Sequence, residues 1–207
     1  MKFLVNPSHP LHKYLSQAVD LYLLNILFLI TSGFGLFLGP ALTALYSVHF
    51  AVLTDYRERS LIIEYFRAYK RNFKRGMTLQ LILVAAGICL FISYRCTRLM
   101  TGSAGILVQP GLIIITIILT VMLILVFPYT ARYKNGLGKT FKVCLQVAAL
   151  NLKKTLLLLV LPGAILITAI QSNFLLTALL ILLIFVGFSA MTAISAKIIL
   201  PVFKQYE

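Results

Sequence analysis

The stretch DYRERSLIIEYFRAYKRNFKR, residues 55–75, decides how this chain is expected to fold. It is the longest polar interval in a chain made mostly of apolar runs. Its apolar residues recur at i, i+4, i+7 and i+11, which is one stripe of an α-helix: Ile62, Phe66, Tyr69 and Phe73. The opposite face is basic. A helix that is basic on one face and aromatic on the other suits the headgroup layer of a membrane, so the stretch predicts a helix on the membrane surface.

The composition of the 207 residues is that of a membrane protein. Hydrophobic residues make up 60%, charged residues only 12%, and the mean hydropathy is +0.97. A soluble domain of this length needs far more charged surface, which predicts an integral membrane protein. The net charge of +14 lies between apolar runs rather than in a nucleic-acid-binding module. Membrane lipids with anionic headgroups are therefore the expected partners, and nucleic acid is not.

Six apolar runs are expected to cross the membrane as helices, which makes the chain an all-α membrane protein. The runs lie at 18–38, 40–57, 77–94, 110–130, 155–170 and 174–196. Amphipathic surface helices are expected at 58–73 and 139–152. Residues 1–207 then form a single polytopic membrane domain.

The distribution of charge predicts the orientation. Of 19 Lys and Arg residues, all but Arg95 and Arg98 fall on the side that would hold both termini and the two basic intervals. Such an excess is typical of the cytoplasmic side, so both termini are expected in the cytoplasm. If the short second run did not cross, the first basic interval would lie outside. The charge pattern therefore favours that span more than its length does.

The two basic intervals superimpose when the sequence is shifted by 79 residues. The shift places Asn72-Phe73-Lys74-Arg75 on Asn151-Leu152-Lys153-Lys154. Asn can cap the helix that leaves the surface, and the adjacent cations can reach the headgroups. This predicts a parallel repeat of span, surface helix and span. The alternative is that any segment beside a membrane needs a cap and some charge.

Short motifs along most of the chain carry a family resemblance. They are Asn25-Ile26-Leu27-Phe28, Gly39-Pro40-Ala41, Ala44-Leu45-Tyr46, Phe66 with Tyr69, Lys70, Asn72 and Phe73, Phe127-Pro128, Ala131-Arg132-Tyr133, and Asn151. Their order and spacing resemble the YesL-like family of bacterial integral membrane proteins, a family without an established biochemical activity. Members often have a Pro and a Thr before the Gly-Pro turn, where this chain reads GFGLFL, and a Trp at the position of Phe28.

That resemblance implies a plasma-membrane protein of Gram-positive type, often encoded beside carbohydrate-uptake or carbohydrate-degrading systems. It implies no particular activity.

Two polar residues within the apolar runs are candidate intramembrane contacts, Asn25 and His49. Each can form a hydrogen bond between helices, or each can contact a substrate or a proton. The cationic residues of the basic intervals form a candidate anionic-lipid surface: Arg67, Lys70, Arg71, Lys74, Arg75, Lys139, Lys142, Lys153 and Lys154.

Catalytic machinery is not evident in the sequence. None of the five acidic residues lies deep in an expected span, and no nucleotide-binding loop, nucleophile elbow or zinc motif is present. No catalytic residue, metal site or cofactor is therefore predicted.

Three functions follow from these observations. The first is a non-enzymatic accessory or regulatory partner of a carbohydrate-uptake or signalling system, with a membrane transporter or sensor as its partner. The second is a small solute carrier or channel, possibly for a sugar. The third and weakest is a membrane enzyme that acts on a lipid-linked substrate.

Overall fold

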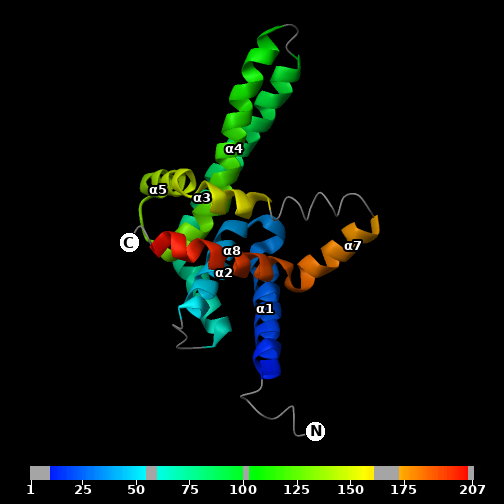
Figure 1. The fold of residues 1–207 in the computed structure, drawn as a ribbon, viewed down its shortest axis with the longest axis vertical. Helices are drawn as coiled ribbons and strands as arrows, with labels where there is room; N and C mark the ends of the chain where they lie inside the picture. The colour runs from blue at the N-terminus through cyan, green and yellow to red at the C-terminus, as the bar shows by residue number, and fades with distance from the viewer. Residues whose placement is uncertain (1–9, 55–59, 100–102, 161–172, 205–207) are drawn as a thin grey trace.

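The computed structural model describes residues 10–54, 60–99, 103–160 and 173–204. Apart from short turns, these residues are helical (Figure 1). In chain order the elements are α1 (Pro10–Ser32), η2 (Gly33–Gly35), α2 (Leu38–Leu53), α3 (Leu61–Leu99), α4 (Ser103–Arg132), α5 (Leu137–Leu150), a helical segment Leu152–Val160, α7 (Asn173–Leu182), the π-helix η3 (Leu183–Gly187) and α8 (Phe188–Phe203). The predicted all-helical class is confirmed for this part of the chain.

Helix α2 is the central element of the fold. It contacts α1, α3, α4 and α8, and ten of its sixteen residues are buried. Ala41, Ala44 and Leu45 have no exposed surface at all. The apolar sequence of α2 is therefore accounted for by contact with protein, since burial against other helices removes the same surface from water that lipid would.

Helix α2 begins where its backbone crosses that of α3. A Cβ atom added at Gly39 would overlap the carbonyl oxygen of Gly76, and one added at Gly76 would lie 2.7 Å from the nitrogen of Pro40. With glycine at both positions, the two backbones touch with no side chain between them. Further along α2, Ser47 accepts a hydrogen bond from Asn72 of α3 at 3.5 Å. The two helices therefore run antiparallel, with α2 alongside the first half of α3.

A side chain of α3 closes the turn between α1 and α2. Gly33 and Gly35 have φ values of 51° and 107° there, and the turn interrupts the helical hydrogen bonds. Nε2 of Gln80 donates to the carbonyl oxygens of Gly35, at 3.0 Å, and Leu36, at 3.2 Å. Oε1 of Gln80 accepts from the N–H of Gly39 at 2.7 Å. One amide thus satisfies three backbone groups that the turn leaves free.

Helix α3 differs from the prediction of a separate surface helix at 58–73 and a span at 77–94. The described residues from Leu61 to Leu99 form one uninterrupted helix of 39 residues. At about 1.5 Å per residue it is about 58 Å long, roughly twice the thickness of a bilayer core. The sequence between the two expected elements holds Gly76 but no proline, so nothing there stops the helix.

The face of α3 that packs against the protein lies next to the aromatic stripe that the sequence predicts for the membrane side of a surface helix. The side chains that face the protein are Leu61, Tyr65, Ala68, Asn72, Gly76, Leu79 and Leu83. Within the aromatic stripe, Ile62 and Phe66 are 42% and 47% exposed, whereas Tyr69 and Phe73 are partly buried. The two stripes differ by one residue, which corresponds to about 100° around the helix. Both stripes have helical spacing, and contact with α2 decides between them.

Helices α3 and α4 form an antiparallel hairpin that extends well beyond the rest of the protein (Figure 1). Near its base, Nη2 of Arg75 donates to the carbonyl oxygen of Lys134 at 3.2 Å. Farther out, the hydroxyls of Tyr94 and Thr116 lie 3.3 Å apart. The exposed side chains between these contacts are overwhelmingly aliphatic or aromatic, so this surface is suited to lipid.

Four described helices are long and apolar enough to cross a membrane: Leu15–Ser32, Leu61–Leu99, Val108–Arg132 and Leu176–Phe203. Only 17–28% of the most apolar window in each is buried, which leaves a large apolar surface for lipid. A fifth is added if Leu137–Leu150 and Leu152–Val160, bent by 97°, count as one span. The six predicted spans are not confirmed. The second is the buried α2, and the fifth, 155–170, falls partly outside the described residues.

The internal repeat is not confirmed either. Asn72 lies inside the continuous helix α3, whereas Asn151 ends α5, just before the 97° bend. The amide of Asn72 is buried and bonds to Ser47, so it does not cap a helix. The amide of Asn151 donates back to the carbonyl oxygen of Val147 at 3.3 Å. The shared sequence therefore occupies different local structures.

We predict that Gly76→Ala destabilises the protein by about 1–3 kcal/mol, because the added methyl group has to separate two backbones in contact. The matched control is Gly87→Ala on the same helix, where a Cβ atom meets nothing within 4 Å. Thermal melting of the detergent-solubilised protein measures both. Equal melting temperatures for the two variants would contradict the contact between the glycines.

Candidate functional site

The first residue of the candidate site is Asn25, whose side chain is completely buried on α1. Its Nδ2 donates to the carbonyl oxygens of Leu183, at 3.0 Å, and Ile184, at 2.6 Å. Its Oδ1 accepts from the N–H of Ser189 at 3.0 Å. All three backbone partners belong to the junction of η3 and α8, more than 150 residues away in the sequence.

The local structure of that junction explains why an amide is needed. Residues Leu183–Gly187 form a π-helix, whose wider turn disturbs the hydrogen bonds of the neighbouring α-helical turns. The interruption makes carbonyl acceptors and an N–H donor available in a partly buried place, where an unpaired polar group is costly. Asn supplies both a donor and an acceptor from one short side chain. Asn25 therefore stabilises the π-helix from outside it.

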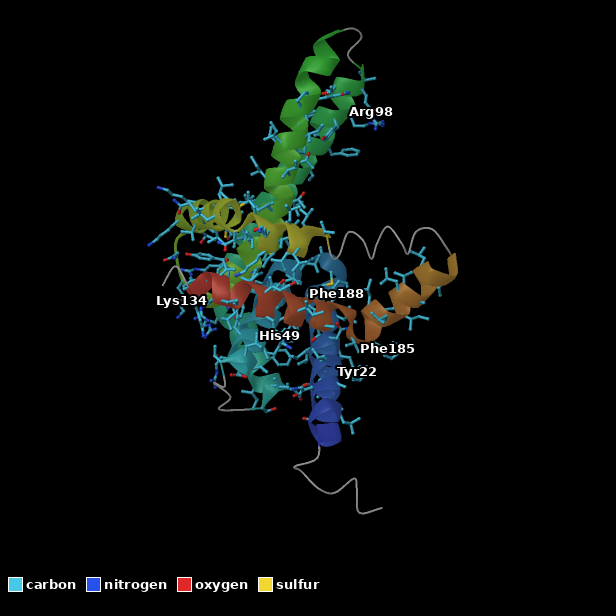
Figure 2. All side chains as sticks on the ribbon, viewed as in Figure 1. Tyr22, His49, Arg98, Lys134, Phe185 and Phe188 are labelled. Atoms are coloured by element: carbon cyan, nitrogen blue, oxygen red, sulfur yellow. The ribbon has the colours of Figure 1, made fainter. Side chains whose placement is uncertain are left out.

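His49 reaches the same junction from α2. Its Nε2 lies 3.3 Å from Oγ of Ser189, and the imidazole is only 5% exposed. Beside it, the rings of Phe28 and Phe188 pack with their centroids 5.0 Å apart. Ser189 thus receives contacts from both sequence-predicted residues, Asn25 through its N–H and His49 through its hydroxyl. We call these three residues the Asn25–Ser189–His49 junction, which joins α1, α2 and α8. Figure 2 labels His49 of this junction.

The geometry of this junction matches the predicted hydrogen bond between helices. Its use by a substrate or a proton remains a prediction. Neither of the two cavities described below is lined by Asn25 or His49. The residues described also contain no group of three or more His, Cys, Asp or Glu side chains that could hold a metal ion.

One cavity is an open apolar groove on α7 and η3, with a volume of about 580 Å³. Its lining residues are Thr177, Ala178, Ile181, Leu182, Phe185 and Val186. At the inner end of the groove, Phe185 stacks on Tyr22 of α1 with ring centroids 6.1 Å apart (Figure 2). The second cavity, of about 10 Å³, lies among α4, α5, the segment Leu152–Val160 and α8, and it is too small to hold more than about one water molecule.

The structure distributes the predicted lipid-binding cations over two separate regions. Arg67, Lys70, Arg71, Lys74 and Arg75 lie on the first half of α3, and all except the half-buried Arg75 are exposed. The second group, Lys139, Lys142, Lys153 and Lys154, lies on α5 and on the bent segment that follows it.

Sequence reasoning missed two residues of these regions. Ser189 carries no signal in the sequence, because nothing in its spacing connects it to residue 25 or 49. Lys134 was recognisable as part of a basic interval. Only the hydrogen bond from Arg75 to its carbonyl oxygen places it against the α3 cations.

The fold and the buried junction define a helical protein of the membrane-spanning class, with several long apolar helices whose surfaces are left uncovered by protein. Residues 21–94 match the model of a family described as "Protein of unknown function, DUF624". The match covers about a third of the chain, from the second half of α1 through α2 to Tyr94 of α3. It is consistent with the YesL-like resemblance without confirming it. No curated protein and no solved structure matches the chain.

We predict that Asn25→Ala destabilises the protein by about 2 kcal/mol or more, since it removes one hydrogen-bond partner from each of three backbone groups. Asn25→Asp should be at least as harmful, because a carboxylate would face two carbonyl oxygens. Thr120→Ala is the control: Thr120 is exposed and bonds only to its own helix. Melting curves in detergent measure all three, and a wild-type melting temperature for Asn25→Ala would refute the role given to this amide.

Proposed function

We propose that this protein is a non-enzymatic bacterial plasma-membrane protein that acts as an accessory or regulatory partner of a carbohydrate-uptake or signalling system. The observation that carries the proposal is how three polar side chains between the helices are used. Asn25, His49 and Gln80 bond to other helices and to interrupted backbone, rather than facing a described cavity. Polar residues used in this way hold helices together.

The apolar surface of α7 and η3 supports an accessory role. Ile181, Leu182, Ile184 and Phe185 are each more than half exposed around the groove. A groove of this kind can receive a helix of a membrane partner, because close packing of side chains drives association within lipid. The carbohydrate context is taken from the family resemblance.

A small solute carrier is the second candidate, and the π-helix favours it. Single π-turns are frequent at functional sites, and interrupted helices at bilayer depth line the binding sites of many carriers. On this hypothesis, the Asn25–Ser189–His49 junction opens during transport. Purified protein in liposomes would then show saturable uptake of a sugar, reduced by His49→Ala. Absence of flux for the sugars tested, with His49→Ala indistinguishable from wild type, would reject the carrier.

We expect the accessory role to depend on the α7 groove. A tagged full-length protein purified from native membranes should retain a component of a sugar-uptake or sensor system, and Ile181→Ser should reduce its yield several-fold. Ile117→Ser on α4 is the matched control, since Ile117 is 55% exposed and Ile181 is 53% exposed. Recovery of no such component, or equal losses with both variants, would contradict the proposal.

The orientation gives a separate prediction. Topology reporters inserted near residues 55–59 and 135–136 should both lie in the cytoplasm, and one at residues 100–102 should lie outside, because the basic intervals stay on the inner side. A cytoplasmic N-terminal reporter agrees with the proposed position of both termini. An external N-terminus would show that α2 does not cross the membrane. The packing of α2 along the first half of α3 is compatible with that result.

A further inference from the structure

The outward face of α3 changes from basic to apolar along one unbroken helix. Helical spacing places Lys70, Lys74, Leu81, Ile88 and Ile92 on the same face. The first two are exposed cations, and the last three are aliphatic side chains that are at least half exposed. The change occurs between residues 74 and 81, over about 10 Å of helix. Such a boundary is expected where a helix passes from headgroups into hydrocarbon.

On helix α4, the boundary between cationic and apolar surface lies at the same level. The hydrogen bond from Arg75 to the carbonyl oxygen of Lys134 sets the end of α4 beside this part of α3. From Arg75 to Arg95 is 20 residues, or about 30 Å of helix, which matches the hydrocarbon thickness of a bilayer. Figure 2 shows Lys134 and Arg98 at opposite ends of the hairpin. The hairpin is therefore an apolar rod with cations at both ends.

The cations at the base of the hairpin are poorly neutralised by the described part of the protein. Its acidic side chains are Asp20 on α1 and Glu64 near the start of α3. Lys74 and Lys134 are exposed, and the guanidinium of Arg75 is held in place by its bond to the main chain. A guanidinium has five N–H donors, so donors remain for an anion.

We propose that Lys74, Arg75 and Lys134 bind the phosphate group of an anionic phospholipid at the base of the α3–α4 hairpin. The site offers two ammonium groups and one guanidinium, which suit a phosphate. Exposed apolar side chains, including Leu81 and Ile82, continue from the site along the hairpin and can receive the acyl chains. The adjoining apolar surface favours a lipid phosphate over a soluble one. Lipid bound at this site fixes how deeply the hairpin lies in the membrane, whichever function the protein performs.

The test compares lipid binding to the two ends of the hairpin. Native mass spectrometry of the full-length protein in detergent measures retention of phosphatidylglycerol and of phosphatidylcholine. We expect preferential retention of phosphatidylglycerol, reduced about tenfold in Lys74→Gln/Lys134→Gln, since each cation near a headgroup contributes to attraction. Arg95→Gln/Arg98→Gln removes the same charge from the other end, outside the proposed site, and should reduce retention far less. Lys74→Arg/Lys134→Arg should bind like the wild type, which separates loss of charge from loss of folding.

Three results would overturn the proposal. Equal retention of phosphatidylcholine would show that headgroup charge is not recognised. Equal effects of the two Gln variants would show that net charge matters and the site does not. Displacement of phosphatidylglycerol by millimolar sn-glycerol 3-phosphate would identify a soluble phosphate as the ligand.

Discussion

The direct contact between the backbones of Gly39 and Gly76 positions the central helix α2. It sets the start of α2 against the middle of α3, and α2 then runs along α3 deeply enough to contact α1, α4 and α8 as well. Any larger residue at either position would separate the two backbones and loosen these contacts together. The neighbouring amide of Gln80 makes the same crossing compatible with an interrupted turn, because it pairs with the backbone groups that the turn leaves free.

A side-chain amide also bonds to interrupted backbone at the Asn25–Ser189–His49 junction. A π-helix interrupts the path from α7 to α8, and the side chain of Asn25 replaces the hydrogen bonds that the interruption removes. Gln80 and Asn25 therefore have the same role: each bonds to backbone groups where a helix is interrupted. In a protein whose outer surfaces are apolar, water is not available to satisfy such groups, so side chains must. This explains why Asn25 and Gln80 lie beside irregular backbone.

The charge distribution also constrains how deeply the protein lies in the membrane. Helix α3 is too long to lie wholly in hydrocarbon, and its basic first half carries the side chains least able to enter it. The apolar second half pairs with α4 over a length that suits a bilayer. The position of the hairpin is thus fixed by where its outward side chains change from cationic to aliphatic, while its internal contacts fix only the pairing of the two helices.

The helical class, the presence of apolar helices and the basic character of the two polar intervals are readable from the sequence alone, because they follow from composition and from residue spacing within one segment. The sequence also singled out Asn25 and His49, since polar residues stand out in apolar runs. It did not separate Leu61, Tyr65 and Ala68 from Ile62, Phe66 and Tyr69 as the inner stripe of α3, because both have helical spacing. Contact with α2 decided that, and likewise made Asn72 an interior residue and Asn151 a helix end. Only the tertiary structure could bring Ser189 to both predicted polar residues, because that depends on how distant helices pack.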